Sequence, residues 1–447
     1  MLAPPTIFAL SSGHGRAGVA VIRMSGPAVG SVLESMAAPR PRPRYAALRR
    51  IRHPATGEVL DRALVLWFPG PSSETGEDMA ELQVHGGRAV VHGVLGALAS
   101  LPGCRLAEAG EFARRAFENG KLDLTGVEGL ADLIDAETAA QRRQALRQAD
   151  GALYAIYEHW RQGLIAAMAL TEAGIDFSDE PDVANDALSQ ARAEIAPIAA
   201  AISAHLDDGH RGELVRDGFQ VVLAGAPNVG KSSLLNALAR RDAAIVSDEP
   251  GTTRDIIEVK LELAGLPVVL SDTAGIRSAT GKVEEEGIKR TLARMRTADL
   301  VLWLMDAADP NALPPPAFLS ARADRHLRLI NKADLIGGSA LAATAEGSLL
   351  ISAFRGFGLD ALLERLATIV VARAGDQEAP ALSQARHRQQ LLRCRAALSS
   401  FLADPIEDAE LRAEDLRRAA QALARLVGAV AVEEVLDQVF GRFCIGK

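Results

Sequence analysis

The segment Gly225-Ala-Pro-Asn-Val-Gly-Lys-Ser232 decides how the middle of this 447-residue chain is expected to fold. An apolar run of strand length, residues 219–224, precedes it, and residues 233–240 follow it as good helix formers without a breaker. Strand, glycine loop, Lys-Ser and helix form the context in which G-x-x-x-x-G-K-[ST] binds phosphate. Main-chain N–H groups surround the β-phosphate there, and the helix N-terminus adds positive partial charge. Lys231 is expected to reach the β- and γ-phosphates and Ser232 to hold Mg²⁺, so the segment predicts a nucleoside triphosphate site.

Length and composition indicate a globular protein of two to four domains, with 48% apolar and 24% charged residues. No apolar run reaches membrane-spanning length, and Met-Leu-Ala-Pro-Pro at the N-terminus lacks a signal pattern. Cys104, Cys394 and Cys444 lie far apart, which argues against a disulfide framework or a zinc knuckle. We therefore expect a cytoplasmic protein. The net charge of −8 argues against a surface that coats nucleic acid, although a local basic patch stays open.

Residues 1–118 are predicted to form an N-terminal α+β domain. Its candidate strands are residues 6–10, 18–23, 63–68 and 79–85. Between the second and third lies a basic segment, residues 39–52, in which Pro and Arg first alternate. Such a sequence excludes a helix or an inner strand, so the segment is expected to be exposed. Contact with RNA phosphates and a merely solvated connection are both open readings of it.

Helical periodicity occupies residues 119–215 and returns over residues 376–447, while residues 216–375 alternate strand and helix. The helices each carry one apolar stripe and need partners, which predicts a bundle. We therefore predict one helical domain split into two segments, with a nucleotide domain inserted between them. The inserted unit is predicted to be a mostly parallel, doubly wound α/β sheet with strands at residues 219–224, 256–263, 266–271, 299–305, 327–330 and 348–352.

Two motifs behind the phosphate loop concern the γ-phosphate and its metal. Gly251-Thr-Thr-Arg-Asp255 supplies a switch threonine, Thr253, for Mg²⁺. Asp272-Thr-Ala-Gly275 follows a predicted strand, where Asp272 holds Mg²⁺ through water and the Gly275 N–H senses the γ-phosphate.

Two further motifs concern the base. In Asn331-Lys-Ala-Asp334 the Asp334 carboxylate accepts N–H bonds from guanine N1 and N2, which adenine cannot supply. Ser352-Ala353 would place a main-chain N–H near guanine O6. Each motif alone is weak, but their order and spacing together predict GTP. The residues predicted to contact it are Asn228, Val229, Gly230, Lys231, Ser232, Ser233, Ser247, Thr252, Thr253, Asp272, Thr273, Ala274, Gly275, Asn331, Lys332, Asp334, Ser352 and Ala353.

The hydrolytic residues are less obvious from the pattern. The position after Gly275 is Ile276, which cannot orient water as a glutamine would. Catalysis therefore needs another polar group and another positive charge. The carboxylates of Val283-Glu-Glu-Glu286 are candidates to orient the water, although a solvated helix start explains any one of them as well.

Asn228, the Gly-Thr-Thr-Arg-Asp motif, Ile276, the segment from Ser73 to Gly87 and the C-terminal Phe443-Cys-Ile-Gly-Lys447 occur together in one family. Over its whole length the chain resembles MnmE (TrmE), the tRNA uridine-5-carboxymethylaminomethylation GTPases. The resemblance implies an N-terminal folate-binding and dimerisation domain, a split helical domain and an inserted G domain. It also implies a homodimer whose G domains associate across their switch face to order the switch loop.

The resemblance implies K⁺ beside the GTP phosphates, in place of an arginine finger. The K⁺ positions fall on Asn228, Ser247, Glu249 (through its carbonyl) and Thr252, and the Mg²⁺ ligands on Ser232 and Thr253. Glu284 matches the family's catalytic glutamate, which polarises the attacking water through a bridging water.

The resemblance also implies a site for 5-formyl- or 5,10-methylene-tetrahydrofolate, formed by Arg23, Glu81, Lys121 and Lys447. Cys444 corresponds to the family's required cysteine, and a direct nucleophilic role for it is a hypothesis. One departure lies beside the folate positions, where Glu74 replaces the usual aromatic residue.

The leading functional hypothesis is a K⁺-dependent GTPase that helps to add a carboxymethylaminomethyl or aminomethyl group at C5 of the tRNA wobble uridine. A flavin-dependent MnmG (GidA) partner would share the chemistry in a heterotetramer or larger complex, since no flavin motif occurs here. The alternative is a ribosome-assembly or signalling GTPase that acts as a binding switch. Tetrahydrofolate binding separates the two hypotheses.

Overall fold

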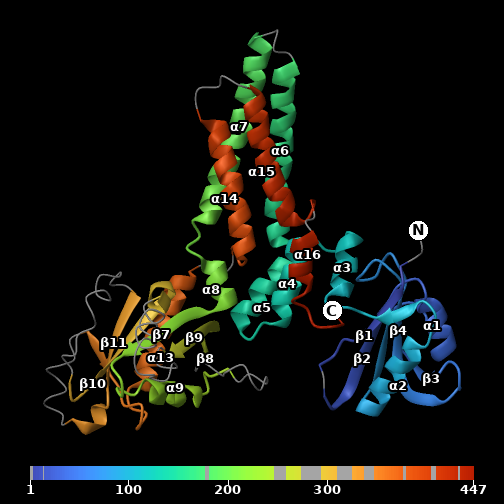
Figure 1. Cartoon of the computed structure of the whole chain (residues 1–447), viewed down its shortest axis with the longest axis horizontal. Helices are drawn as coiled ribbons and strands as arrows, with labels where there is room; N and C mark the ends of the chain where they lie inside the picture. The colour runs from blue at the N-terminus through green and yellow to red at the C-terminus, as the bar shows by residue number, and fades with distance from the viewer. Residues whose placement is uncertain are drawn as a thin grey trace, which may run out of the picture. The chain divides into compact units, whose positions relative to one another are not determined.

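The computed structural model describes residues 4–13, 15–176, 181–245, 258–272, 293–309, 325–336, 347–375, 379–403, 409–430 and 433–446. The chain divides into two compact units. The first comprises Met1–Ala131, Gln148–Ile195 and Ala397–Lys447, and the second comprises Asp132–Arg147 and Ala196–Ala396. Figure 1 labels most of their elements, and each unit is described by itself.

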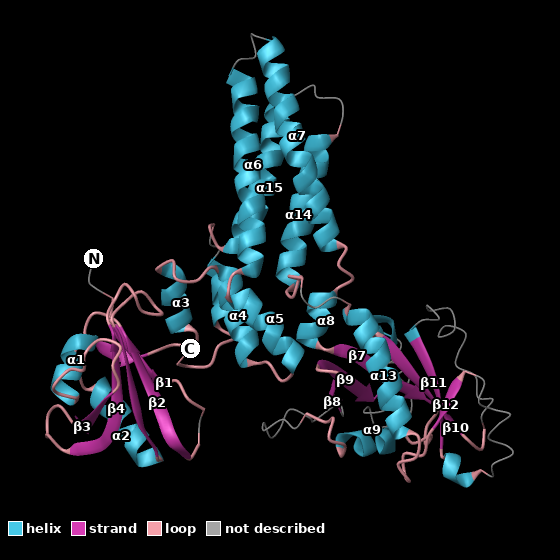
Figure 2. Cartoon of the chain, turned by 180° about the vertical axis from the view of Figure 1, so that it is seen from behind, coloured by secondary structure: helices cyan, strands magenta, loops and turns pink. Residues whose placement is uncertain are grey.

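A six-stranded sheet of order β3-β4-β5-β2-β1-β6 begins the first unit. Its pairs are antiparallel except for β1 with β6. Its strands are β1 (Thr6–Leu10), β2 (Ala17–Ser25), β3 (Ala47–Arg52), β4 (Val59–Phe68), β5 (Met79–Gly86) and β6 (Cys104–Leu106). Helices α1 (Val29–Met36) and α2 (Arg88–Ala99) pack their apolar side chains on one face (Figure 2). The predicted strands of this region are confirmed.

The basic segment forms more structure than its sequence suggests. Residues 47–52 are β3, an edge strand in which Ile51 is buried while Arg50 and Arg52 are exposed. The prediction of an exposed segment outside the inner sheet holds, but the strand itself was missed. One apolar residue among three arginines gives too weak a period-2 signal to reveal it.

Helices make up the rest of the first unit. They include α3 (Glu111–Glu118), α4 (Leu124–Ile134), α6 (Ala152–Asp176), α15 (Ala409–Val427) and α16 (Glu433–Phe440). Helix α6 packs along α15 although more than 200 residues separate them in the sequence. Ala113, Leu124 and Val127 share an apolar cluster with Val439 and Phe443, so the C-terminal segment packs against helices far earlier in the chain.

The second unit is built on a sheet of order β12-β11-β10-β7-β9-β8. All pairs are parallel except β8 with β9. The strands are β7 (Phe219–Gly225), β8 (Glu258–Leu263), β9 (Leu266–Asp272), β10 (Leu300–Asp306), β11 (His326–Asn331) and β12 (Ser348–Leu350). This is the predicted α/β sheet of a P-loop domain.

Apolar residues point alternately to the two faces of the central strand β7. Val221 and Leu223 pack with α9 (Lys231–Ala239) and α13 (Leu359–Ala374), and Val222 and Ala224 pack with Ala298 on the other face. Within the described residues the chain also forms α5 (Ala139–Ala149), α7 (Pro181–Leu206), α8 (Arg211–Asp217) and α14 (Ala385–Leu402). No helix within the described ranges is both long and apolar enough to cross a membrane.

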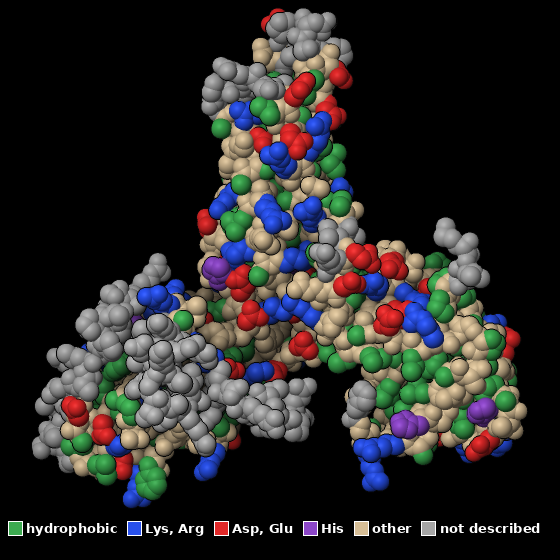
Figure 3. Space-filling view, in the orientation of Figure 1, with side chains coloured by type: hydrophobic (Ala, Val, Ile, Leu, Met, Phe, Trp, Pro, Cys, Tyr) green, Lys and Arg blue, Asp and Glu red, His purple; other side chains and the backbone are tan. Residues whose placement is uncertain are grey.

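Charged side chains of both signs occur on the face of the molecule drawn in Figure 3. On the face seen in Figure 3, Lys and Arg alternate with Asp and Glu, and no broad patch of one sign forms there.

A buried arginine joins the sheet of the first unit to α3. The Arg115 residue is 7% exposed, and its guanidinium binds Glu77 at 2.9 Å, Glu111 at 3.0 Å and the Pro5 carbonyl at 2.9 Å. Removing it would leave the Glu77 carboxylate, whose side chain is 18% exposed, without a cation, while Glu111 would keep its pair with Arg105. Leaving a mostly buried charge unpaired is costlier than losing a surface pair.

We expect Arg115→Met to lower the local free energy of unfolding of β1 and β2 by about 3 kcal/mol. The neighbouring Arg114→Met is the matched control, because Arg114 binds the exposed Asp437, and its loss should stay below about 1 kcal/mol. Amide hydrogen exchange of the full-length protein measures both. Equal losses in the two variants would contradict the assigned role of Arg115.

Candidate functional site

The phosphate loop connects β7 to α9 at the carboxyl edge of the sheet. Gly230 caps α9 with a φ of +96°, and a Cβ there would lie 2.4 Å from Nδ2 of Asn331. Glycine is therefore required at this position for both conformation and space. In the sheet, β7 lies between β9 and β10, so the chain passes first to one side of β7 and later to the other. The loop that follows β7 therefore lies at the topological switch point, where such sheets bind ligands.

The side chain of Lys231 is bound to the main chain of the phosphate loop. Its Nζ donates to the carbonyls of Gly225 at 3.0 Å and Ala226 at 2.9 Å. Burial lowers the pKa of the Lys231 ammonium group, while the nearby Asp272 carboxylate opposes that shift. A triphosphate would offer this partly desolvated cation a stronger anionic partner than two carbonyls.

The two motifs predicted to face Mg²⁺ are in direct contact. The Ser232 hydroxyl donates to Oδ2 of Asp272 at 3.0 Å, although the two residues come from α9 and the end of β9. Asp272 is 3% exposed. A hydroxyl and a carboxylate oxygen are the ligand types that Mg²⁺ prefers, so this pair fits the ion.

Asn331 joins the base motifs to the phosphate loop. Its side chain is buried, donates to the Val229 carbonyl at 2.8 Å and accepts from the Ala353 N–H at 3.0 Å. One amide therefore holds the loop and the Ser352-Ala353 turn in a fixed relation. The sequence predicted all these residues for the site, but not this bridging role.

The predicted guanine reader, Asp334, lies beside Ser352. The Ser352 hydroxyl donates to Oδ1 of Asp334 at 2.6 Å, and the Asp334 side chain is exposed.

Lys332 pairs with Asp306 at 2.6 Å, and this bond is the largest cause of the lowered pKa of the Asp306 carboxyl. Asp306 ends β10 and was not predicted; an Asp after an apolar strand is its only sequence signal.

Of the other residues predicted for this site, some lie within the described ranges and some lie outside them. Asn228 is exposed with a positive φ of 64°, Val229 is buried, and Ser233 lies in the first turn of α9. The predicted residues that fall outside the described ranges are Ser247, Glu249, Thr252, Thr253, Thr273, Ala274, Gly275 and Glu284. Their roles stay predictions.

In the first unit, Arg23 and Glu81 face each other across the antiparallel pair of β2 and β5. The Arg23 guanidinium binds Glu81 at 3.0 Å and also Glu74 at 3.0 Å. Two of the four predicted folate residues are therefore neighbours. The contact with Glu74 was not predicted.

Lys121 belongs to the same neighbourhood. A Cβ on Gly76 would lie 3.2 Å from Cε of Lys121 and 2.9 Å from Cβ of Asn119, so both side chains lie against the loop that follows Glu74. Asn119 also donates to the Thr75 carbonyl at 2.8 Å and fixes this loop. Asn119 was missed by the sequence analysis, because nothing in the pattern around it suggests a role.

The C-terminal tail docks beside the end of β1. The Ser11 hydroxyl donates to the Gly446 carbonyl at 2.8 Å, and Ile445 forms a β-bridge with Ala109. Cys444 is exposed in this tail, and Lys447 lies outside the described residues. Because β1 neighbours β2, the tail comes to the strand beside the one that carries Arg23.

The other two cysteines differ from Cys444. Burial raises the pKa of the Cys394 thiol to about 12, and burial also raises the pKa of the Cys104 thiol. Both are therefore poor sources of thiolate at neutral pH. Cys444 is the exposed thiol, as its position in a terminal tail suggested.

Two family models match the chain. The model for the GTP-binding protein TrmE N-terminus covers residues 6–121, and the model for the MnmE helical domain covers residues 124–444. The tRNA modification GTPase MnmE of Rhodospirillum rubrum is 51% identical over 455 residues, which are 99% of each chain. The protein of the same name from Methylorubrum populi is 54% identical over 444 residues, covering 99% of this chain and 98% of its own.

A mitochondrial relative is similar to the same extent. The human 5-taurinomethyluridine-[tRNA] synthase subunit GTPB3 is 50% identical over 460 residues, covering 99% of this chain and 93% of its own. Together with the two family models, these full-length matches show that the chain belongs to the MnmE (TrmE) family.

Proposed function

We propose that this protein is a GTP hydrolase that acts in the modification of tRNA at the wobble uridine. The observation that carries the proposal is the convergence of the phosphate, metal and base motifs on one sheet edge, held by Asn331. The full-length relatives named as tRNA modification GTPases support the same reading. In the reaction, water attacks the γ-phosphorus and the bond to the β-phosphate oxygen breaks, which gives GDP and phosphate.

Each described residue has a defined part in this proposal. Lys231 would neutralise charge on the β- and γ-phosphates, and Ser232 with Asp272 would hold Mg²⁺, which supplies further positive charge. Asp334 would exchange its Ser352 partner for the two N–H groups of guanine. Glu284 is proposed to orient the attacking water, on family resemblance alone.

Asp334→Asn should reduce GTP affinity at least about a hundredfold, because an amide offers only one acceptor oxygen and its NH₂ opposes the guanine donors. The same variant should gain affinity for xanthosine triphosphate, whose C2 oxygen accepts from that NH₂. Nucleotide titration of the full-length protein measures both changes. Asp360→Asn, an exposed aspartate on α13 of the same unit, is the control. Unchanged GTP affinity in Asp334→Asn would contradict the assignment.

We also propose that K⁺ activates the hydrolysis, with Asn228 as one ligand. Asn228 has a positive backbone φ, a conformation that few residues other than glycine adopt, and its side chain is exposed. A further cation would offset charge that develops on the phosphates, and so supply the additional positive charge that catalysis needs.

Asn228→Gly tests this role without imposing backbone strain, since glycine accepts the same φ. We expect K⁺ to accelerate phosphate release by the wild type relative to Na⁺, and the variant to lose at least about tenfold in rate along with that preference. GDP affinity should change little. Equal turnover of the wild type in Na⁺ and K⁺ would reject the K⁺ proposal.

We propose that the first unit binds a tetrahydrofolate that carries one carbon. The neighbouring Arg23 and Glu81, with Lys121 against the same loop, offer a carboxylate for the pterin N–H edge and cations for the glutamate tail. Lys447 and the docked tail would complete the site. The carbon would pass to C5 of uridine with a flavin-dependent MnmG partner, and the chain would act as a homodimer in the cytoplasm.

Lys121→Gln should weaken binding of 5-formyltetrahydrofolate about tenfold, the scale of one charge-assisted bond. Isothermal titration of full-length protein measures it, with Arg114→Gln as a control arginine outside the loop. No detectable binding by the wild type would favour the alternative of a GTPase that acts as an assembly or signalling switch.

A further inference from the structure

Strands β3 and β4 direct alternate side chains toward α1 and α2 and away from them. Ile51, Ala63 and Val65 are buried in one apolar cluster with residues of those helices. Because side chains alternate along a strand, Arg50 and Arg62 lie on the opposite face, where both are exposed. Charges of the basic segment therefore gather on the face that is turned away from the two helices.

Arg50 and Arg62 lie directly opposite each other. They are partners in the register of the antiparallel pair β3 and β4. Like charges at such positions repel each other and destabilise a sheet. Among the residues that the structure describes, neither guanidinium forms an ion pair with a carboxylate. The pair therefore costs stability that no described contact of these side chains offsets.

Two further arginines extend this charge. Arg52 on β3 is exposed and donates to the Gly57 carbonyl at 3.0 Å. Arg44 donates to the Ser72 carbonyl, and its Cζ lies 5.8 Å from the centre of the Phe68 ring. Phe68 follows Arg62 on β4 by an even number of residues, so the ring and Arg62 share a face. The exposed arginines of this face form the arginine row, which consists of Arg44, Arg50, Arg52 and Arg62.

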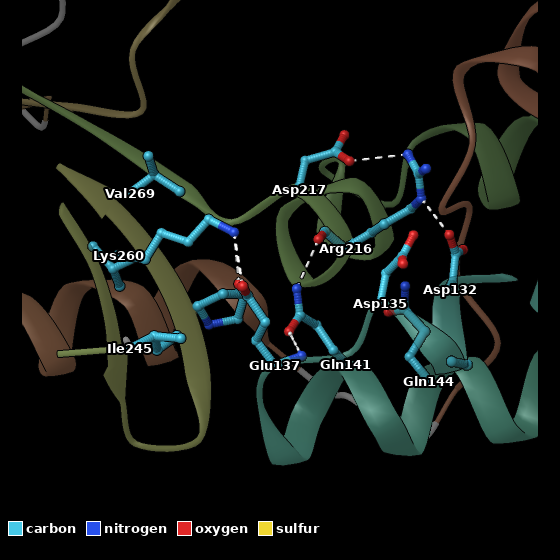
Figure 4. Close-up of a pocket in the computed structure, with 13 residues that line it drawn as sticks. Asp132, Asp135, Glu137, Gln141, Gln144, Arg216, Asp217, Ile245, Lys260 and Val269 are labelled. Atoms are coloured by element: carbon cyan, nitrogen blue, oxygen red, sulfur yellow. Dashed lines mark hydrogen bonds and ion pairs between the residues drawn. The ribbon is translucent and has the colours of Figure 1, made fainter. Parts of the chain in front are cut away.

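The cations around a pocket of the second unit show the contrasting case. Figure 4 shows Arg216 paired with Asp132 at 2.9 Å and Lys260 paired with Glu137 at 2.8 Å. The charges there neutralise each other within the protein. The partners of Arg44 and Arg52 are carbonyls and a ring, which orient a guanidinium and leave its positive charge in place.

The sequence around the arginine row is strongly basic in an acidic chain. Residues 40–62 contain seven arginines and two acids, Glu58 and Asp61, whereas the net charge of the whole chain is −8. The Asp61 carboxylate is already bound to His85 at 2.8 Å, and its side chain is 9% exposed. Such a local concentration of positive charge indicates a polyanionic partner.

Protection of a sheet edge does not account for the row. Charged side chains on an edge strand prevent strands of other molecules from pairing with it. Strand β3 is such an edge, but β4 lies between β3 and β5. Edge protection therefore leaves Arg62 unexplained, and it does not require the same charge at both opposite positions.

We propose that the arginine row binds the phosphate backbone of tRNA. This inference rests on the proposed action of the protein on tRNA. Phosphates follow one another along an RNA strand as these arginines follow one another along β3, and a guanidinium forms paired N–H bonds with a phosphate. Tyr45, next to Arg44, is 68% exposed and offers a ring on which an unpaired base can stack. Both features favour RNA over an acidic protein, and two copies of the row facing each other would repel.

Arg50→Gln with Arg62→Gln should weaken binding of an unmodified tRNA transcript about tenfold. The slope of log affinity against log salt concentration should fall by about two, because two phosphate contacts are lost. The fold should persist, since the substitutions remove a repulsion. Arg50→Lys with Arg62→Lys should stay within about threefold of the wild type, because it keeps both charges. Fluorescence anisotropy of a labelled transcript with the full-length protein, at several salt concentrations, measures these changes.

Arg365→Gln with Arg393→Gln is the matched control, since it removes two exposed arginines from α13 and α14. Its affinity and salt slope should equal those of the wild type. An equal loss in this control would overturn the proposal, and so would unchanged affinity in Arg50→Gln with Arg62→Gln.

Two other outcomes would assign the row to a different partner and overturn the proposal. One is a change of oligomeric state in the Arg50→Gln, Arg62→Gln variant by light scattering, which would indicate a contact between copies of the chain. The other is unchanged tRNA affinity with lost tRNA modification in cells, which would indicate an acidic protein partner. A wild type that does not bind tRNA would instead reject the proposed function, and this inference with it.

Discussion

The side-chain amide of Asn331 is the interaction on which the nucleotide site depends. Its NH₂ group donates to the Val229 carbonyl in the phosphate loop, and its oxygen accepts from the Ala353 N–H in the base motif. Both bonds are buried or partly buried, where an unpaired amide would be costly. The phosphate loop and the predicted base motif are therefore held in a fixed relation by one side chain. Gly230 makes this possible, because any larger residue would displace that amide.

In the first unit, strand pairing and one loop bring the predicted folate residues together. Strand register places Arg23 opposite Glu81, and the loop of residues 74–76 adds Glu74 and brings Lys121 close. Arg23 therefore has two carboxylate partners. Under the folate proposal, a pterin that pairs with Glu81 would share this carboxylate with Arg23, and Glu74 would keep the guanidinium neutralised. The departure at Glu74 is in this view a second anion for Arg23 as well as a change in local packing.

Much of the fold could be predicted, because its signals are local. Strands β7, β9 and β11 are largely apolar runs that each end at a loop motif, whereas β8 alternates buried Val259 and Leu261 with exposed Lys260 and Glu262. The edge strand β3 was missed because one buried Ile51 among arginines has no clear period. The contacts of Asn331 with Val229 and of Glu137 with Lys260 were also beyond reach, since residues more than 100 positions apart meet only through the tertiary fold.

The central claim is that GTP turnover by this protein serves a modification at C5 of the wobble uridine. Nucleoside analysis of tRNA from cells that lack the protein tests this claim most directly. The proposal predicts loss of a C5-modified wobble uridine, restored by the wild-type gene and not by one that encodes Asp334→Asn. An unchanged set of modified uridines in the deletion strain would contradict it.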